Sequence, residues 1–118
     1  MAQLLLASYT LDSMKARAQI LPTYQEYARE LAIEDNLNVQ DFLDTISCES
    51  GWNATIKGDQ DKAEGIAQIR LDYWPSITKE KADDPYWALR FMASQWAQHH
   101  ETYWSCYKNR LTASIPIR

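Results

Sequence analysis

The chain has 118 residues, of which 46% are hydrophobic and 24% are charged, and it contains only three glycines. These values are typical of a single globular domain with a hydrophobic core, and they argue against a loop-rich β fold. The formal net charge is −4 and no run of Lys or Arg is present, so a nucleic acid is not an expected partner.

The N-terminal part predicts two helices. In the first, apolar residues follow one another at three- and four-residue steps: Leu4, Ala7, Leu11, Met14 and Ala18. The short apolar run within residues 3–7 has no Lys or Arg before it and Asp12 soon interrupts the pattern, so neither a secretory signal nor a membrane span is expected. Pro22 suits the first turn of the second helix. Its buried side is expected to hold Tyr24, Tyr27, Ala28 and Leu31.

The third predicted helix carries a carboxylate at its C-terminal end. Asn38 can cap this helix, and apolar residues follow it at helical spacing: Phe42, Leu43 and Ile46. Gly51 stands where a left-handed stop residue is wanted, which places Glu49 in the last turn, on or beside the apolar face. The negative end of the helix and the loss of water both favour a protonated carboxyl, which can act as a general acid. From spacing alone, a surface glutamate is an equal alternative.

A polar loop from Trp52 to Glu64 follows this helix. Its segment Asp59-Gln60-Asp61 invites comparison with a calcium loop, but an EF-hand-like spacing would place Ala63 at a ligand position and offers no closing Glu. A calcium site is therefore not expected. Gly65 to Leu71 is expected to be a short extended segment or a tight turn, in which apolar neighbours surround Gln68.

Two further helices follow an aromatic turn at residues 73–75. Thr78 can cap a short helix through Ala82, and Asp84 and Pro85 suit the first positions of the next helix. The helix that begins at Asp84 and Pro85 is predicted to be a central core helix, because it has a broad, mostly apolar stripe: Trp87, Ala88, Phe91, Met92, Gln95 and Trp96.

The C-terminal part offers no metal site. His99 and His100 are adjacent, so they cannot point the same way on a helix, and they lack the spacing of metal-binding histidines. The folded part is expected to end with Trp104, Cys106 and Tyr107, before a loose tail from Thr112 to Arg118. Since the chain has no βαβ unit, phosphate-binding loop or Ser-centred nucleophile elbow, any chemistry rests on Glu49.

Two segments of the sequence together resemble a known family. Ser47-Cys48-Glu49-Ser50-Gly51-Trp52-Asn53, followed by Gly65-Ile66-Ala67-Gln68-Ile69, is similar to the two signature motifs of soluble lytic transglycosylase catalytic domains. These domains belong to the lysozyme-like superfamily, alongside goose-type lysozymes. The resemblance covers roughly residues 24–107 and includes Asp84-Pro85 and Trp104-Ser105-Cys106-Tyr107. It implies a mainly α, compact lysozyme-like helical domain over residues 1–118, with at most a short extended segment near Gly65–Leu71.

The resemblance assigns roles to particular residues. Glu49 matches the family's catalytic acid and base, Ser50 the residue whose hydroxyl helps to hold the substrate or that carboxyl, and Gln68 a residue lining the cleft near the N-acetyl sugars. Family members often end with a Tyr-Asn-Ala-Gly element whose tyrosine approaches the catalytic Glu. That string is absent here, and Tyr107 is the candidate for the tyrosine's place. Three aromatic residues are candidates for stacking on sugars, although each is as well explained as core: Trp52, Tyr73 and Trp74.

The reaction implied is cleavage of the β-1,4 bond between N-acetylmuramic acid and N-acetylglucosamine in peptidoglycan glycan strands. Protonated Glu49 donates to the leaving oxygen, the 2-acetamido group of the substrate takes the place of a protein nucleophile, and Glu49 then removes the proton of the sugar's own 6-hydroxyl. The product carries a 1,6-anhydro ring. No cofactor is implied, a periplasmic or cell-wall location is expected, and a monomer is the default expectation, although the sequence does not fix the oligomeric state.

Two other functions remain open. A lysozyme-type muramidase would need a second carboxylate to hold a water molecule, for which Asp59, Asp61 and Glu64 are candidates. Glu64 also stands directly before Gly65, where small residues are common in the family. A catalytically silent glycan-binding module is the other alternative, although both Glu49 and Gln68 are present.

Cys48 and Cys106 are too few for a disulfide scaffold or a four-cysteine zinc site. In a lysozyme-like fold, the end of the Glu49 helix and the closing Trp104–Tyr107 segment are expected to meet, and a cell-wall enzyme works outside the reducing cytosol. The resemblance therefore implies a disulfide that holds Glu49 against the C-terminal segment. Two buried free thiols are the alternative.

Overall fold

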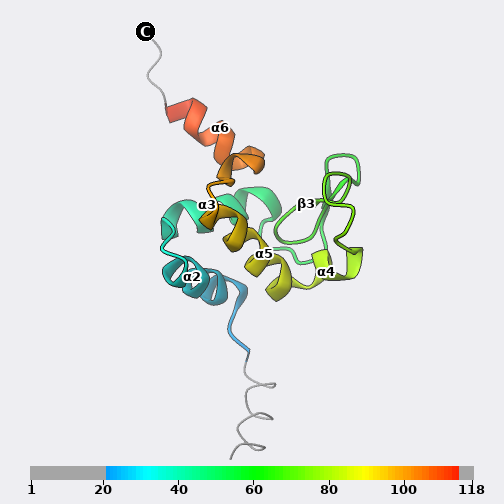
Figure 1. Cartoon of the computed structure of the whole chain (residues 1–118), viewed down its shortest axis with the longest axis horizontal. Coiled ribbons are helices and arrows are strands. Elements are labelled where there is room, and N and C mark those ends of the chain that lie inside the picture. The colour runs from blue at the N-terminus through cyan, green and yellow to red at the C-terminus, as the bar shows by residue number, and fades with distance from the viewer. Residues whose placement is uncertain (1–20, 115–118) are drawn as a thin grey trace, which may run out of the picture.

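The computed structural model describes residues 21–114, which contain five α-helices, one 3-10 helix and one small antiparallel sheet (Figure 1). The helices are α2 (Tyr24–Glu34), α3 (Val39–Ser50), α4 (Lys79–Asp83), α5 (Pro85–Ala97) and α6 (Ser105–Ser114), and the 3-10 helix is η1 (Glu101–Tyr103). The strands are β1 (Lys57–Gly58), β2 (Ala63–Glu64) and β3 (Ile69–Arg70). The mainly α class predicted from the sequence is confirmed. No described helix is both long and apolar enough to cross a membrane.

Two predictions concern the ends of the chain. The helix predicted from Leu4 to Ala18 lies outside the described residues. The loose tail predicted from Thr112 is wrong in part, because α6 continues to Ser114. No Gly or Pro interrupts α6 before Pro116, so nothing in the sequence stops the helix at Tyr107. Residues 115–118 lie outside the described part.

Helix α2 begins later than Pro22 suggested, because a capping box fixes its start. The Thr23 hydroxyl accepts a hydrogen bond from the Glu26 backbone N–H at 3.1 Å, and the Glu26 carboxylate accepts one from the Thr23 backbone N–H at 3.3 Å. Pro22 lies just before the helix, where its carbonyl accepts a hydrogen bond from the Tyr86 hydroxyl at 2.8 Å. The predicted inner side of α2 is confirmed, with Ala28 and Leu31 buried and Tyr24 and Tyr27 partly buried against the core.

Helix α3 has the start and the end that the sequence predicted. The Asn38 side-chain oxygen accepts a hydrogen bond from the Asp41 backbone N–H at 2.9 Å. At the other end, Gly51 adopts a left-handed conformation with φ 58° and its N–H bonds to the Ser47 carbonyl. Phe42 and Ile46 are fully buried, so Glu49, one turn further on, lies in the last turn beside the buried face.

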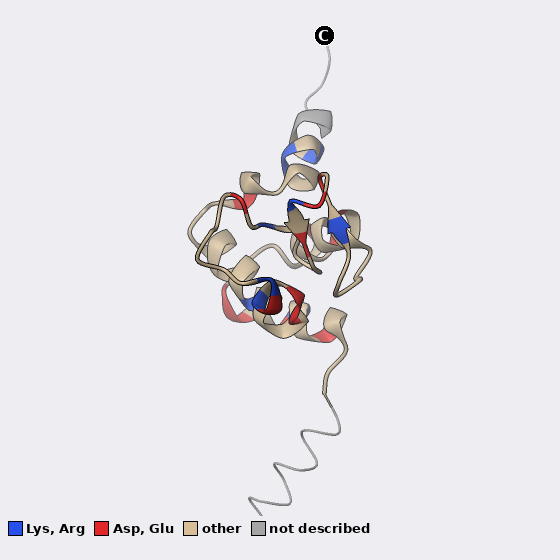
Figure 2. Cartoon of the chain, turned by 90° about the vertical axis from the view of Figure 1, so that its right-hand side faces the viewer, with Lys and Arg blue, Asp and Glu red and all other residues tan. Residues whose placement is uncertain are grey.

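The sheet is short and lies beside α4. β2 pairs with β1 and β3, and Glu64 stands opposite both Lys57 and Ile69. The extended segment expected near Gly65–Leu71 is confined to β3, because residues 65–68 form a tight turn. Gly65 in that turn has φ 81°, and a Cβ there would collide with the Ala82 carbonyl of α4. Acidic and basic residues are interspersed on the sheet and α4 (Figure 2).

Helix α5 is the central element of the core, as predicted. It crosses the middle of the domain with α2 on one side and α4 on the other (Figure 1). The Trp96 ring of α5 meets the Phe42 ring edge-on, with centroids 5.2 Å apart. The largest fully buried side chains come from α3, α5, β3 and the turn before β3: Phe42, Ile46, Ile66, Ile69, Leu89 and Met92. This core fixes the end of α3 relative to the turn that carries Gln68.

Candidate active site

Glu49 lies in a cleft of about 340 Å³ between the end of α3, the sheet and the start of α6. Its side chain is half-buried, so the alternative of an exposed surface glutamate is wrong. The residues that line the cleft are Cys48, Glu49, Gly58, Asp59, Ala63, Gln68, Arg70, Tyr73, Tyr103, Trp104 and Ser105. They come from distant parts of the chain, which meet only in the folded domain.

The surroundings of Glu49 favour its neutral form. Burial is the main cause that raises the pKa of the Glu49 carboxyl above the usual value, and the negative charge of Asp59 adds to the effect. Hydrogen bonds from the Cys106 backbone N–H and the Ser105 hydroxyl act in the opposite direction but do not cancel it. The Ser105 oxygen lies 3.2 Å from Glu49 Oε1. A carboxyl of this kind can hold a proton near working pH and release it to a substrate.

An aromatic depression of about 440 Å³ continues the cleft away from Glu49. It is lined by Gln68, Arg70, Tyr73, Trp74, Tyr103 and Trp104, and all of these except Trp74 also line the Glu49 cleft. Tyr73 and Tyr103 are 69% and 61% exposed. Because nearly all residues of the aromatic depression also line the Glu49 cleft, the two depressions form one groove in which exposed aromatic rings lie near the carboxyl.

Gln68 is held in the wall of this groove by its own side chain. It has a left-handed backbone with φ 47°, and its amide nitrogen donates to the Gly65 carbonyl at 3.0 Å and to the Ile56 carbonyl at 3.2 Å. A Cβ at Gly58 would overlap the Gln68 side-chain oxygen, so a larger residue at position 58 would require the end of this side chain to shift. The structure thus places Gln68 in the same cleft as Glu49.

Arg70 is a groove residue that the sequence did not single out. Its guanidinium lies 3.2 Å from the Asp59 carboxylate and 2.6 Å from the Asp72 carboxylate. The Arg70 Cζ atom also lies over the Tyr73 ring, 4.3 Å from the ring centroid. The motif Asp59-Gln60-Asp61 therefore contributes an ion pair at the cleft wall. The only local signal was the Arg70-Leu71-Asp72 spacing, which does not reveal the contact with Asp59.

Three residues predicted for substrate contact do not line the groove: Ser50, Trp52 and Tyr107. Ser50 is 5% exposed, and its hydroxyl donates to the Ile46 carbonyl and accepts from the Trp52 backbone N–H, both at 3.1 Å. It therefore stabilises the end of α3 and does not hold the Glu49 carboxyl. Trp52 is partly buried against the core.

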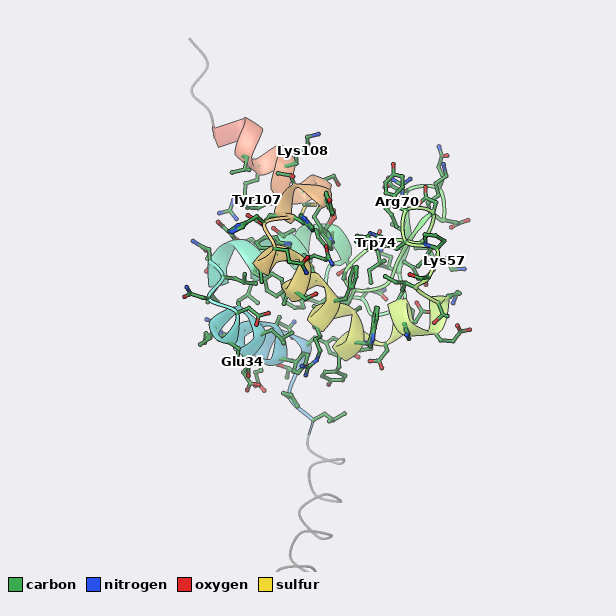
Figure 3. All side chains as sticks on the ribbon, in the orientation of Figure 1. Glu34, Lys57, Arg70, Trp74, Tyr107 and Lys108 are labelled. Carbon is green, nitrogen blue, oxygen red and sulfur yellow. A yellow bond between two sulfur atoms is a disulfide. The ribbon has the colours of Figure 1, made fainter. Side chains whose placement is uncertain are left out.

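Tyr107 is also placed away from Glu49. It packs against Trp96 with ring centroids 4.9 Å apart and lines a separate depression with Asp41 and Glu101. Figure 3 shows it at a distance from Arg70 and Trp74, which lie toward the sheet. The reason is helical geometry, because Ser105, Cys106 and Tyr107 are successive residues of α6 and leave it in different directions. Ser105, which the sequence did not indicate, is the α6 side chain that contacts Glu49.

Of the three candidate carboxylates for a water-activating base, only Asp59 lines the cleft. Glu64 is 3% exposed and lies 3.9 Å from the Lys79 ammonium, beside Asp83 of α4. Asp61 is exposed in the β1–β2 turn. The described residues contain no group of three His, Cys, Asp or Glu side chains that could hold a metal ion.

The predicted disulfide is present. Cys48 and Cys106 are bonded, with their Cα atoms 6.1 Å apart and a sequence separation of 58. The bridge joins the residue before Glu49 to the residue after Ser105. Trp104 is anchored on the other side of Ser105, where its indole N–H donates to the Ala67 carbonyl at 2.6 Å.

The site thus combines a half-buried carboxyl of raised pKa, a carboxylate that is ion-paired with an arginine, and exposed aromatic rings along one groove. Such a groove can bind an extended ligand with apolar faces and transfer a proton to it. Comparisons with known proteins provide no further assignment, because no family model, no curated protein and no solved structure matches this chain.

Proposed function

We propose that this chain is a peptidoglycan lytic transglycosylase of the kind that its two sequence motifs resemble, with Glu49 as the single acid and base. The main supporting observation is the placement of Glu49, half-buried at the end of α3, with a raised pKa and within a groove that also contains Gln68. The exposed rings of Tyr73 and Tyr103 provide surfaces on which sugar rings can stack.

The proposed reaction uses Glu49 twice. The protonated carboxyl donates to the glycosidic oxygen between N-acetylmuramic acid and N-acetylglucosamine while an oxocarbenium-like state develops. The 2-acetamido group of the substrate stabilises the anomeric carbon after the bond breaks. Glu49, now a carboxylate, takes the proton from the sugar's 6-hydroxyl, whose oxygen bonds to the anomeric carbon and closes the 1,6-anhydro ring. Glu49 ends the cycle protonated, and no water molecule is consumed.

Replacing Glu49 with glutamine tests this assignment. Glu49→Gln keeps the shape of the side chain but cannot cycle a proton, so glycan cleavage should fall by roughly 10²–10⁴-fold. Glu34→Gln is the matched control, since Glu34 is an exposed glutamate in the last turn of α2, remote from the groove (Figure 3). Cleavage of purified peptidoglycan is measured by chromatography of the released fragments. A Glu49→Gln chain that cleaves at the wild-type rate would reject the assignment.

Asp59 keeps a muramidase as the second candidate, because its carboxylate lines the same cleft. In that case Asp59 would activate water, and the products would carry reducing ends. Mass spectrometry of the products distinguishes the two functions, since 1,6-anhydro ends are lighter by one water molecule. Binding of glycan strands without any cleavage would instead indicate a silent glycan-binding module.

A location outside the cytoplasm forms part of the proposal. The Cys48–Cys106 disulfide is compatible with an oxidising compartment such as the periplasm or the cell wall. Fractionation of cells that express the full chain, with detection by an antibody, tests the location directly.

A further inference from the structure

Glu49 receives hydrogen bonds from two neighbouring residues at the start of α6. The Ser105 hydroxyl donates to Glu49 Oε1 at 3.2 Å, and the Cys106 backbone N–H donates to the same carboxyl. Ser105 is 56 residues away from Glu49 in sequence, so this contact exists only after the chain has folded. Both donors stabilise the charged form of Glu49, which is the form that must act as a base.

The position of Ser105 is fixed from both sides. On one side, the Cys48–Cys106 disulfide ties the start of α6 to the residue that precedes Glu49. On the other side, Trp104 is 4% exposed and its indole N–H bonds to the Ala67 carbonyl at 2.6 Å, in the turn that carries Gln68. Ser105 therefore has little freedom to move away from Glu49.

The Ser105 hydroxyl is not needed to build α6. A backbone hydrogen bond at the start of the helix runs from the Lys108 N–H to the Trp104 carbonyl at 3.1 Å. Within the described part of the chain, the Ser105 hydroxyl bonds to Glu49 and not to the helix backbone. The side chain is exposed, so its removal leaves no cavity in the core. The contact with Glu49 is thus separable from the stability of the fold.

We propose that Ser105 is a positioning residue for Glu49, whose hydroxyl orients the carboxyl in the groove and is delivered to it by the Cys48–Cys106 bridge and by Trp104. This inference rests on the proposed function of Glu49. In this scheme Ser105 contacts the Glu49 carboxyl and does not contact the substrate. It restricts the rotation of the carboxyl and supports its charged form between the two proton transfers.

The other charged and titratable groups at the cleft do not provide this function. Asp59, from the β1–β2 turn, and Arg70, from β3, pair with each other at 3.2 Å. Tyr73 and Tyr103 contribute exposed phenol rings to the wall. Among the described residues, Ser105 is the one side chain that donates a hydrogen bond to Glu49.

A set of matched variants tests the proposal in the full, disulfide-bonded chain. Ser105→Ala and Ser105→Val remove the hydroxyl, and Ser105→Thr keeps it on a side chain of the same shape as valine. Ser47→Ala is the control, because Ser47 is an exposed serine of α3 that does not line the cleft. For each variant, the Glu49 carboxyl is titrated by ¹³C NMR, and kcat and KM for peptidoglycan fragments are measured across pH.

The proposal expects the Ala and Val variants to raise the pKa of Glu49 above its wild-type value, because a donor to the carboxylate is lost. The declining limb of kcat should move to higher pH, and the maximal kcat should fall about tenfold with little change in KM. Ser105→Thr should restore both readouts, and Ser47→Ala should change neither. A purely structural role for Ser105 would instead change the thermal stability and leave the Glu49 titration unaltered.

Two results would overturn the proposal: a Glu49 titration that is the same in wild type, Ser105→Ala and Ser105→Val, or a Thr variant that behaves like Val. The NMR titration needs no substrate. If the wild-type chain cleaves no glycan, the proposed function fails, while the titration still decides whether Ser105 controls the carboxyl. A Cys48→Ala/Cys106→Ala chain adds a further arm, because it should shift the Glu49 titration in the same direction as Ser105→Ala.

Discussion

At the scale of single residues, the proton affinity of Glu49 results from opposing effects. Burial and the charge of Asp59 raise its pKa, whereas the donors at the start of α6 lower it. The acid step of the proposed reaction needs the protonated form. The rate of glycan cleavage should therefore decline as pH rises through the raised pKa of Glu49, and a pH–rate profile of kcat measures this decline. A profile that stays flat from mildly acidic to alkaline pH would contradict the assignment of Glu49 as the acid.

Glu64 is a second carboxyl whose protonation is linked to the fold. Burial is the main cause that raises its pKa, followed by the neighbouring carboxyl of Asp83. A carboxyl with a raised pKa in the folded state stabilises the fold fully below its unfolded value of about 4.5, and this stability is lost as pH rises through the folded value. Glu64→Gln imitates the protonated form, so the free energy of unfolding of this variant should decrease less than that of wild type between pH 4 and pH 8.

Urea denaturation at several pH values measures the effect of Glu64→Gln. Glu80→Gln serves as the control, because Glu80 is an exposed glutamate of α4. If wild type and Glu64→Gln show parallel pH dependence, the pKa of Glu64 is the same in the folded and unfolded chains, and the protonated pairing with Asp83 is wrong.

At the scale of elements, local signals predicted the helices and long-range contacts decided the site. Asn38, Gly51, Thr78 and Asp84 each mark a helix end by side-chain or backbone chemistry that acts within four residues, and each was predicted correctly. The start of α2 was misjudged because Thr23 and Glu26 form a capping box that outweighs the preference of Pro22. Glu49 was identified from its place on α3 and its motif.

The contacts of Glu49 with Ser105 and of Arg70 with Asp59 could not be predicted from the sequence. They join residues 56 and 11 positions apart, and their formation depends on how α6 and the sheet pack against α3. The orientation of α6 also explains why the prediction for Tyr107 was wrong. The motif suggested that Tyr107 contacts Glu49, but its side chain leaves α6 toward Trp96. Sequence spacing defines the elements, whereas the relative orientation of the elements defines the site.

The two left-handed glycines should differ in their tolerance of a side chain. Gly51 has φ 58° and open space around its Cβ position, so Gly51→Ala should cost roughly 1–2 kcal/mol through backbone strain alone. Gly65 has φ 81°, and its added Cβ would also collide with the Ala82 carbonyl, so Gly65→Ala should cost roughly 2–5 kcal/mol. Chemical denaturation of both variants measures the difference. Equal losses of stability in the two variants would mean that the Ala82 carbonyl moves aside at little cost and does not constrain the turn at residues 65–68.

At the scale of the whole molecule, the disulfide determines how the C-terminal segment closes on the domain. It connects the end of α3 to the start of α6, and these two helices are also joined by ion pairs from Arg110 to Asp41 and Asp44, each at 3.2 Å. The ion pairs involve partly exposed side chains and contribute little by themselves. The covalent bridge is therefore the main constraint that keeps α6 against Glu49.

Removal of this bridge should loosen both the fold and the site. The bridge closes a loop over a separation of 58 residues, and the chain-entropy model gives a stabilisation of about 4 kcal/mol for such a loop, as an upper value. A dithiol reductant converts the disulfide into two thiols and is itself oxidised to a disulfide. In the reduced chain, the free energy of unfolding should fall by up to this amount. Glycan cleavage should also fall, because Ser105 and Cys106 are no longer held against the Glu49 carboxyl.

Denaturation and cleavage are measured with and without reductant, and the Cys48→Ala/Cys106→Ala chain separates loss of the bridge from side reactions of the reductant. Two titratable thiols per untreated, denatured chain would show that the bridge does not form, and unchanged stability after complete reduction would show that it does not constrain the fold.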